Sequence, residues 1–173
     1  MALFFSTNTD ARFEVAITID PALNTMTQSE KDEYLRTGDN SLLKINEGEA
    51  PTWFVLKAMG PQDRERAEVN AGAYTRSELG RLLWIEEPKD YKEKAYWREN
   101  LTDIEKKALS SYELYINRVY EEMVKGSVIE VKGSGDKPWD LLQSIRPDAY
   151  RVKAVSELIF HIQRLSLLSD QGK

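Results

Sequence analysis

The residue that most readily transfers protons at neutral pH is histidine, and this sequence contains a single one, His161. Glu157 precedes it by four residues, which on a helix places the two side chains one turn apart on the same side. A carboxylate in that position could orient the imidazole as a general base. No motif of an activated nucleophile accompanies the pair, so a surface contact between the two side chains is the simpler interpretation.

Other reactive side chains are scarce. The absence of Cys excludes disulfides, thiolate zinc sites and thiol nucleophiles, and one His cannot supply a multi-histidine metal site. The adjacent pairs Glu86-Glu87 and Glu121-Glu122 would point about 100° apart on a helix, so neither pair is expected to share a metal. The segment KGSGDK (132–137) lacks the frame of a phosphate-binding loop. The sequence therefore predicts no catalytic residue, no metal site and no cofactor.

Aromatic residues in polar surroundings are the more informative feature. Tyr91, Tyr96 and Trp97 lie in a charge-rich segment, and Trp139 follows Pro138. Aromatic side chains of this kind often anchor a protein partner, although loops also deliver them to a core. We take Tyr91, Tyr96, Trp97 and Trp139 as candidate partner-binding residues.

The same segment permits a nucleic-acid hypothesis, in which Tyr91 and Trp97 stack on bases. The cations for the phosphates would be Lys89, Lys92, Lys94 and Arg98. Acidic residues alternate with these cations, and the whole chain has a net charge of −5. Because phosphate binding needs a concentrated basic face, the sequence disfavours nucleic acid as a partner.

The composition is that of a soluble globular protein, with 173 residues, 41% of them apolar and 31% charged. This length suits one domain, with or without an appendage. The start, MALFFSTNTDARF, lacks the charged beginning and long apolar stretch of a secretory signal. No window approaches the roughly 18 apolar residues of a membrane span. We therefore expect a cytoplasmic protein without membrane association.

Hydrophobic periodicity in the first third predicts strands. Residues 12–19 alternate strictly, residues 42–45 form a plausible short strand, and the apolar run 52–59 predicts a central strand. Between them, Thr27 and Glu30 have the spacing of a capping box, and Gly38 suits the end of that helix.

Helical patterns dominate the rest. We expect helices starting at Pro61 and Thr75, a long amphipathic helix over 102–126, a strand over 127–131, and helices over 138–145 and from Pro147 onward. The predicted class is α+β, with a small antiparallel sheet in the N-terminal third packed with several helices and a helical C-terminal half. Residues 1–87 would form a strand-rich region with two helices. Residues 88–173 would form a helical region with a flexible joint at 132–137.

Three stretches together resemble the small assembly proteins of tailed bacteriophages, especially tail assembly chaperones. They are PTWFVLKAM (51–59), the helical middle, and the closing segment VSELIFHIQRLS (155–166). The resemblance implies a non-enzymatic factor that binds tail-tube or tape-measure subunits in the cytoplasm of a bacterial host. It also leaves room for homo-oligomers. A virion structural protein, such as a connector or capsid accessory protein, is an alternative, and a small hydrolase-type enzyme using His161 is a weaker one.

Overall fold

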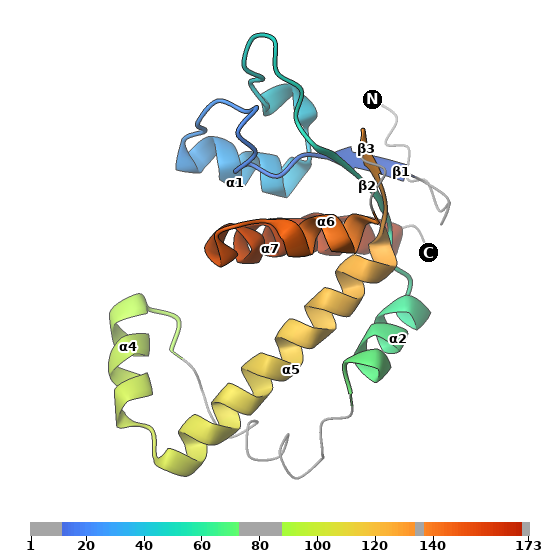
Figure 1. The fold of residues 1–173 in the computed structure, drawn as a ribbon. Coiled ribbons are helices and arrows are strands. Elements are labelled where there is room, and N and C mark those ends of the chain that lie inside the picture. The colour runs from blue at the N-terminus through green and yellow to red at the C-terminus, as the bar shows by residue number, and fades with distance from the viewer. Residues whose placement is uncertain (1–11, 73–87, 134–136, 171–173) are drawn as a thin grey trace.

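The computed structural model describes residues 12–72, 88–133 and 137–170, with side chains up to residue 166, and it confirms the α+β class (Figure 1). The elements in chain order are β1 (Arg12–Val15), α1 (Gln28–Thr37), the 3-10 turn η1 (Asn40–Leu42), β2 (Trp53–Lys57), α2 (Pro61–Ala71), α4 (Tyr91–Asn100), α5 (Asp103–Ser127), β3 (Val128–Lys132), α6 (Pro138–Ser144) and α7 (Asp148–Asp170). The helix predicted from Thr75 falls outside the described residues, as do residues 134–136 of the predicted joint.

The described strands form one antiparallel sheet in the order β1-β2-β3. Strand β2 lies in the middle, as its continuous apolar sequence predicts, and Phe54, Val55 and Leu56 are buried. The small antiparallel sheet predicted for the N-terminal third is present, and the strand predicted over 127–131 joins it as β3 from the C-terminal half. It directly follows the long helix α5, so the sheet ties the two halves of the chain together.

Strand β1 is shorter than the alternating pattern predicts. Beyond Val15, side chains instead of a neighbouring strand form the hydrogen bonds of its backbone. The Tyr34 hydroxyl donates to the backbone oxygen of Ala16 at 2.9 Å and accepts from its N–H at 3.0 Å. Glu157 accepts from the N–H of Thr18 at 2.6 Å. Since these backbone groups are already satisfied, sheet pairing is not needed to keep them buried.

Residues 20–52 make an excursion between β1 and β2, which we call the N-terminal lobe. Its helix α1 has the predicted capping box of Thr27 and Glu30, and Gly38 ends it with a φ of 66°. The prediction of a strand at 42–45 is wrong. The chain turns through η1 there, and Ile45 makes only an isolated bridge to Leu23.

The helices begin where local capping rules place them. Pro61 opens α2 directly after Gly60, and the capping box of Thr102 and Glu105 opens α5. The amphipathic stripe of α5 buries Val119, Met123 and Val124 near its C-terminal end. Helix α4 was not predicted, because its sequence alternates charges without a clear apolar face.

The main core lies where α5, α7 and the sheet meet, with Phe54, Leu56, Leu158 and Ile162 among its most buried side chains. A separate, smaller cluster fills the N-terminal lobe and consists of Leu23, Met26, Tyr34 and Leu43, joined by Ala16 from just before the lobe. Figure 1 shows α7 lying between this lobe and α5, while α4 stands beside the far end of α5. None of the helices in the described part of the chain is long and apolar enough to cross a membrane.

Candidate functional site

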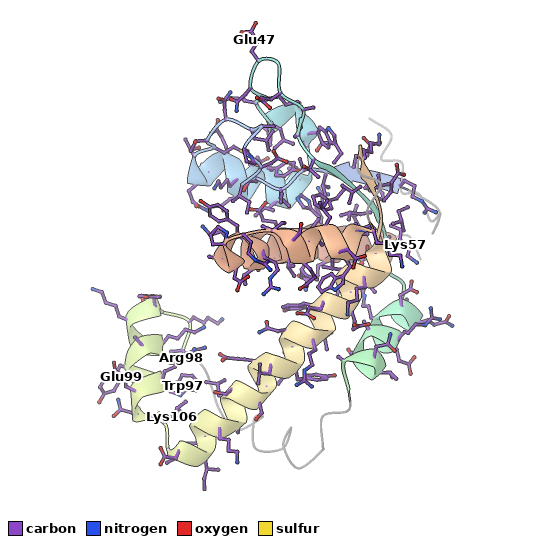
Figure 2. The ribbon with its side chains drawn as sticks, in the orientation of Figure 1. Glu47, Lys57, Trp97, Arg98, Glu99 and Lys106 are labelled. Atoms are coloured by element: carbon purple, nitrogen blue, oxygen red, sulfur yellow. The ribbon has the colours of Figure 1, made fainter. Side chains whose placement is uncertain are left out.

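Helix α4 carries three of the four candidate partner-binding residues. Asp90 starts the helix by accepting hydrogen bonds from the backbone N–H groups of Lys92 (2.9 Å) and Glu93 (3.1 Å). Tyr91 is 85% exposed and Tyr96 is 71% exposed, whereas Trp97 is half-buried. In Figure 2, Trp97 and Arg98 point from α4 toward α5. The helix therefore presents two tyrosines to solvent and turns its tryptophan inward.

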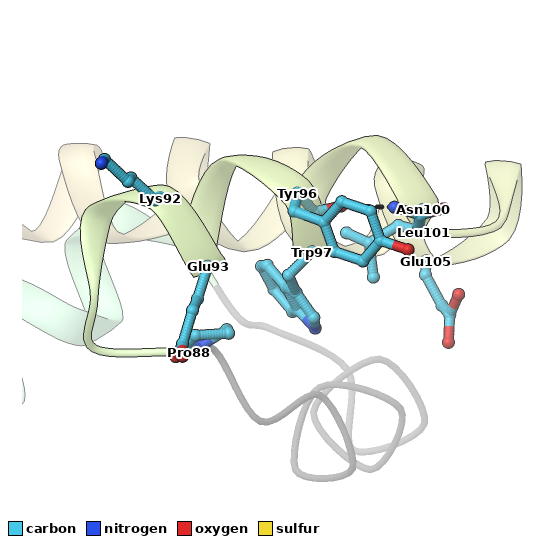
Figure 3. Close-up of a pocket in the computed structure, with 8 residues that line it drawn as sticks. All are labelled: Pro88, Lys92, Glu93, Tyr96, Trp97, Asn100, Leu101 and Glu105. Carbon is cyan, nitrogen blue, oxygen red and sulfur yellow. Dashed lines mark hydrogen bonds between the residues drawn. The ribbon is translucent and has the colours of Figure 1, made fainter.

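An open groove of about 740 Å³ runs along this helix and its connection to α5 (Figure 3). Its lining residues are Pro88, Lys92, Glu93, Tyr96, Trp97, Asn100, Leu101 and Glu105. Pro88, Trp97 and Leu101 supply apolar surface, and charged side chains flank it. Glu105 belongs to the capping box of α5, where it accepts a hydrogen bond from the Thr102 hydroxyl. Its hydrogen bonds with Thr102 lower its pKa.

The cations of the nucleic-acid hypothesis do not form an open basic face. Arg98 donates to Glu113 on α5 at 2.7 Å. This ion pair neutralises the Arg98 charge and fixes α4 against α5. Lys94 is also engaged in an interaction. Lys89 and Lys92 flank the helix cap Asp90 in the sequence. This arrangement weakens the case for phosphate-backbone binding.

Trp139 lies apart from the α4 aromatics. It is the second residue of α6, where it is half-buried against the main core. The Lys125 ammonium lies 4.9 Å from the centre of its ring, in cation–π contact. Lys125 lies near the C-terminal end of α5. Glu113, which forms the ion pair with α4, lies roughly 18 Å from Lys125 along the same helix, at 1.5 Å per residue. The structure thus places Tyr96 and Trp97 in one groove, with Tyr91 exposed at the start of the same helix, and it places Trp139 elsewhere, half-buried.

The predicted surface contact between His161 and Glu157 is wrong. His161 is 0% exposed, and its ring meets Tyr34 edge-on with centroids 5.0 Å apart. Glu157 turns to Thr18, whose N–H and hydroxyl each donate to it at 2.6 Å. Burial, and then the charge of Arg164, lower the pKa of His161 to about 3. An imidazole so enclosed cannot reach an external substrate.

The sequence contained a signal for this burial. His161 follows Leu158 by three residues and precedes Leu165 by four, so helical periodicity places all three on one side of α7. Leu158, His161, Ile162 and Leu165 are all buried. The interpretation of His161 as a surface residue gave too little weight to that spacing.

A smaller groove of about 360 Å³ was not foreseen, because its walls come from α2, α5 and α7. Its lining residues are Arg64, Glu68, Val119, Tyr120, Met123, Gln163 and Ser166. The Ser166 hydroxyl is committed to structure, accepting from the N–H of Met59 at 3.3 Å and donating to the Ile162 carbonyl at 2.7 Å. Within the described residues, no group of three or more His, Cys, Asp or Glu side chains could hold a metal ion.

Comparison of the chain with known protein families, with curated proteins and with solved structures finds no match.

Proposed function

We propose that this protein is a non-enzymatic protein-interaction or assembly factor that contacts its partner through α4. The observation that carries the proposal is the exposure of Tyr91 and Tyr96 on one short helix. Tyrosine buries a large area at low entropic cost and keeps a hydroxyl for hydrogen bonding, which makes it a frequent anchor at interfaces.

The attachment of α4 also supports this proposal. The helix is joined to α5 through Leu101, which is buried, and through the ion pair of Arg98 with Glu113. It stands at the end of α5 away from the sheet (Figure 1). A partner could therefore cover α4 without disturbing the main core.

The finer proposal is a tail assembly chaperone of a tailed bacteriophage, acting in the host cytoplasm on tail-tube or tape-measure subunits. It rests on the resemblance of residues 51–59 and 155–166 described above. A virion structural protein with the same α4 surface is the alternative. The hydrolase alternative gains no support from His161, because that side chain is fully buried.

Co-expression with the proteins encoded by adjacent genes tests the proposal. We expect one of them to co-purify with the wild-type chain, and the double variant Tyr91→Ser, Tyr96→Ser to lose it. Phe160→Ser is the matched control, since Phe160 is an aromatic residue 57% exposed on α7. Failure to bind any neighbouring structural protein would contradict the proposed function, and equal loss in the control would contradict the role of α4.

A further inference from the structure

The N-terminal lobe rests on α7 through a contact that contains a buried titratable group. Tyr34 of α1 meets His161 edge-on, and Gly38, at the end of α1, lies directly against the guanidinium of Arg164. His161 and Arg164 are three residues apart on α7, so both belong to the same face of the helix. We call this contact, made of Tyr34, Gly38, His161 and Arg164, the clasp.

The clasp holds His161 in a neutral state. Neither ring nitrogen has a hydrogen-bond partner among the residues that the structure describes, and the same is true of the Arg164 Nε. The charged group that acts on the imidazole is the Arg164 guanidinium, which repels a second positive charge. The facing group from α1 is the Tyr34 phenol, whose pKa is raised to about 12 and which is therefore uncharged at neutral pH.

The nearby carboxylate of α7 does not offset this repulsion. Glu157 is committed to Thr18, with both of its oxygens accepting hydrogen bonds. A proton on His161 would therefore create a buried imidazolium beside a guanidinium, without a paired anion. Unpaired buried charges are among the most destabilising features in proteins. Moving α1 away from α7 would relieve this cost by letting water reach the ring.

The lobe is built so that it can move without breaking the sheet. Its ends are fixed by the pairing of β1 with β2, where Val15 faces Phe54, and by Asp20, which accepts from the N–H of Thr52 at 2.8 Å. Ile17 packs in the main core, while Leu23, Met26, Tyr34 and Leu43 form the lobe's own cluster, which Ala16 joins from just before the lobe. The lobe and the main core thus bury largely separate apolar surfaces, which is the condition for local opening.

We infer that the clasp is an acid-responsive device, in which protonation of His161 releases α1 and the N-terminal lobe from α7 while the sheet and the α5–α7 core stay folded. This inference is independent of the proposed function. Ala16 would lose its hydrogen bonds to Tyr34 on opening, whereas Thr18 and Glu157 would remain as the fixed point.

The direction of the pH effect follows from linkage. The pKa of His161 is about 3 in the closed form and returns toward its ordinary value of 6.5 when the ring is solvated. The closed form, in which α1 packs on α7, is therefore stabilised by the neutral imidazole at every pH above 6.5. That stabilisation is lost as the pH falls toward 3. Between about pH 7.5 and about pH 5, the population of the open form should rise about 30-fold.

Hydrogen exchange of the full chain, corrected for the intrinsic pH dependence of exchange, measures this opening. Amides of α1 and of Ala16 should lose protection about 30-fold over that interval, and those of β2 and α5 should keep theirs. His161→Gln removes the titrating group at similar size, so its α1 protection should not depend on pH in this range. Equal loss of protection in α1 and β2 would mean global unfolding and overturn the inference.

A measurement on the wild-type chain keeps the test decisive if His161→Gln does not fold. The chain has one His, so its imidazole signal in the proton NMR spectrum is unambiguous. We expect that signal to stay in its neutral position in the closed form well below pH 6. Titration of the closed form near pH 6.5 would overturn the inference.

Discussion

Glu157 on α7 accepts two hydrogen bonds from Thr18, one from its N–H and one from its hydroxyl, both at 2.6 Å. The two residues are 139 positions apart in the sequence. Their contact ends β1, turns the chain into the N-terminal lobe, and fixes that turn against the last helix. It also explains why Glu157 does not serve His161, its neighbour one helical turn away.

Replacing Glu157 by Gln should lower the free energy of unfolding by about 1–3 kcal/mol, because the bond from the Thr18 N–H loses its charged acceptor and the Thr18 hydroxyl loses the acceptor for its proton. Urea unfolding followed by circular dichroism measures the change. Glu33→Gln is the control, since Glu33 pairs with Arg36 only on the exposed surface of α1 and should cost little. Equal effects of the two variants would contradict the role of Glu157.

Replacing Tyr34 by Phe should cost about 1–3 kcal/mol of stability, because the N–H and carbonyl of Ala16 lose their only described partner in a buried place. Tyr150→Phe, at a side chain 49% exposed, should change stability by less than about 0.5 kcal/mol. Chemical denaturation of both variants at neutral pH gives the comparison. A Tyr34→Phe variant as stable as the wild type would show that the Ala16 groups find other partners.

Gly38→Ala and Gly48→Ala separate backbone strain from crowding. Both glycines have positive φ, 66° and 81°, so each substitution should carry about 1 kcal/mol of backbone strain. At Gly48 nothing lies within 4 Å of the new methyl group, whereas at Gly38 it would overlap the guanidinium of Arg164. We expect Gly38→Ala to be the more destabilising in thermal unfolding, because the half-buried guanidinium must move aside.

A double variant checks the origin of that difference. Combining Gly38→Ala with Arg164→Met replaces the branched guanidinium by a slimmer and more adaptable end, so part of the added loss should be recovered. Strictly additive effects of the two substitutions would mean that Arg164 does not set the cost at Gly38.

Leu158 and Val152 test which face of α7 holds the core. Leu158 is 0% exposed in the main core, and its replacement by Ala should cost about 2–5 kcal/mol. Val152 on the same helix is 60% exposed, so Val152→Ala should stay within about 0.5 kcal/mol of the wild type. Equilibrium unfolding in urea distinguishes them, and similar losses at both positions would contradict the packing of α7.

Glu30 provides a prediction on pH. Its hydrogen bond with Lys44, and then those with Thr27, lower its pKa from 4.5 to about 2. A lowered carboxyl pKa stabilises the fold above pH 4.5, and that contribution is lost as the pH falls toward 2. Lys44→Met should therefore raise the pKa of Glu30, as read from its side-chain carboxyl carbon in NMR titrations. Lys31→Met, at the neighbouring residue, should leave it unchanged.

Local rules made much of the fold predictable from the sequence. The capping boxes at Thr27 and Thr102, the opening of α2 at Pro61 and the end of α1 at Gly38 all lie where expected. These features depend on residues within one helical turn of each other, so neighbouring sequence contains the necessary information. The central place of β2 was predictable for a similar reason, because a strand without a polar side must be covered on both faces.

The sequence also determined what this chain lacks, since no Cys and one His are facts of composition. It named Tyr91, Tyr96 and Trp97 as a group, and the structure adds that the two tyrosines are exposed and that Trp97 lines a groove. The separation of Trp139 from that group was not predictable. It depends on how α6 packs beside the C-terminal end of α5.

Only the tertiary structure decided which groups residues 16–18 and Glu157 contact, and that His161 is buried. Strand β1 ends early because Tyr34 and Glu157, 18 and 139 residues away from their partners, satisfy its backbone groups. Helical spacing placed His161 near Leu158 and Leu165, but its burial also required α1 to lie across α7. Hydrogen bonds and burial between distant segments arise when the chain folds together, and no local pattern specifies which distant group will arrive.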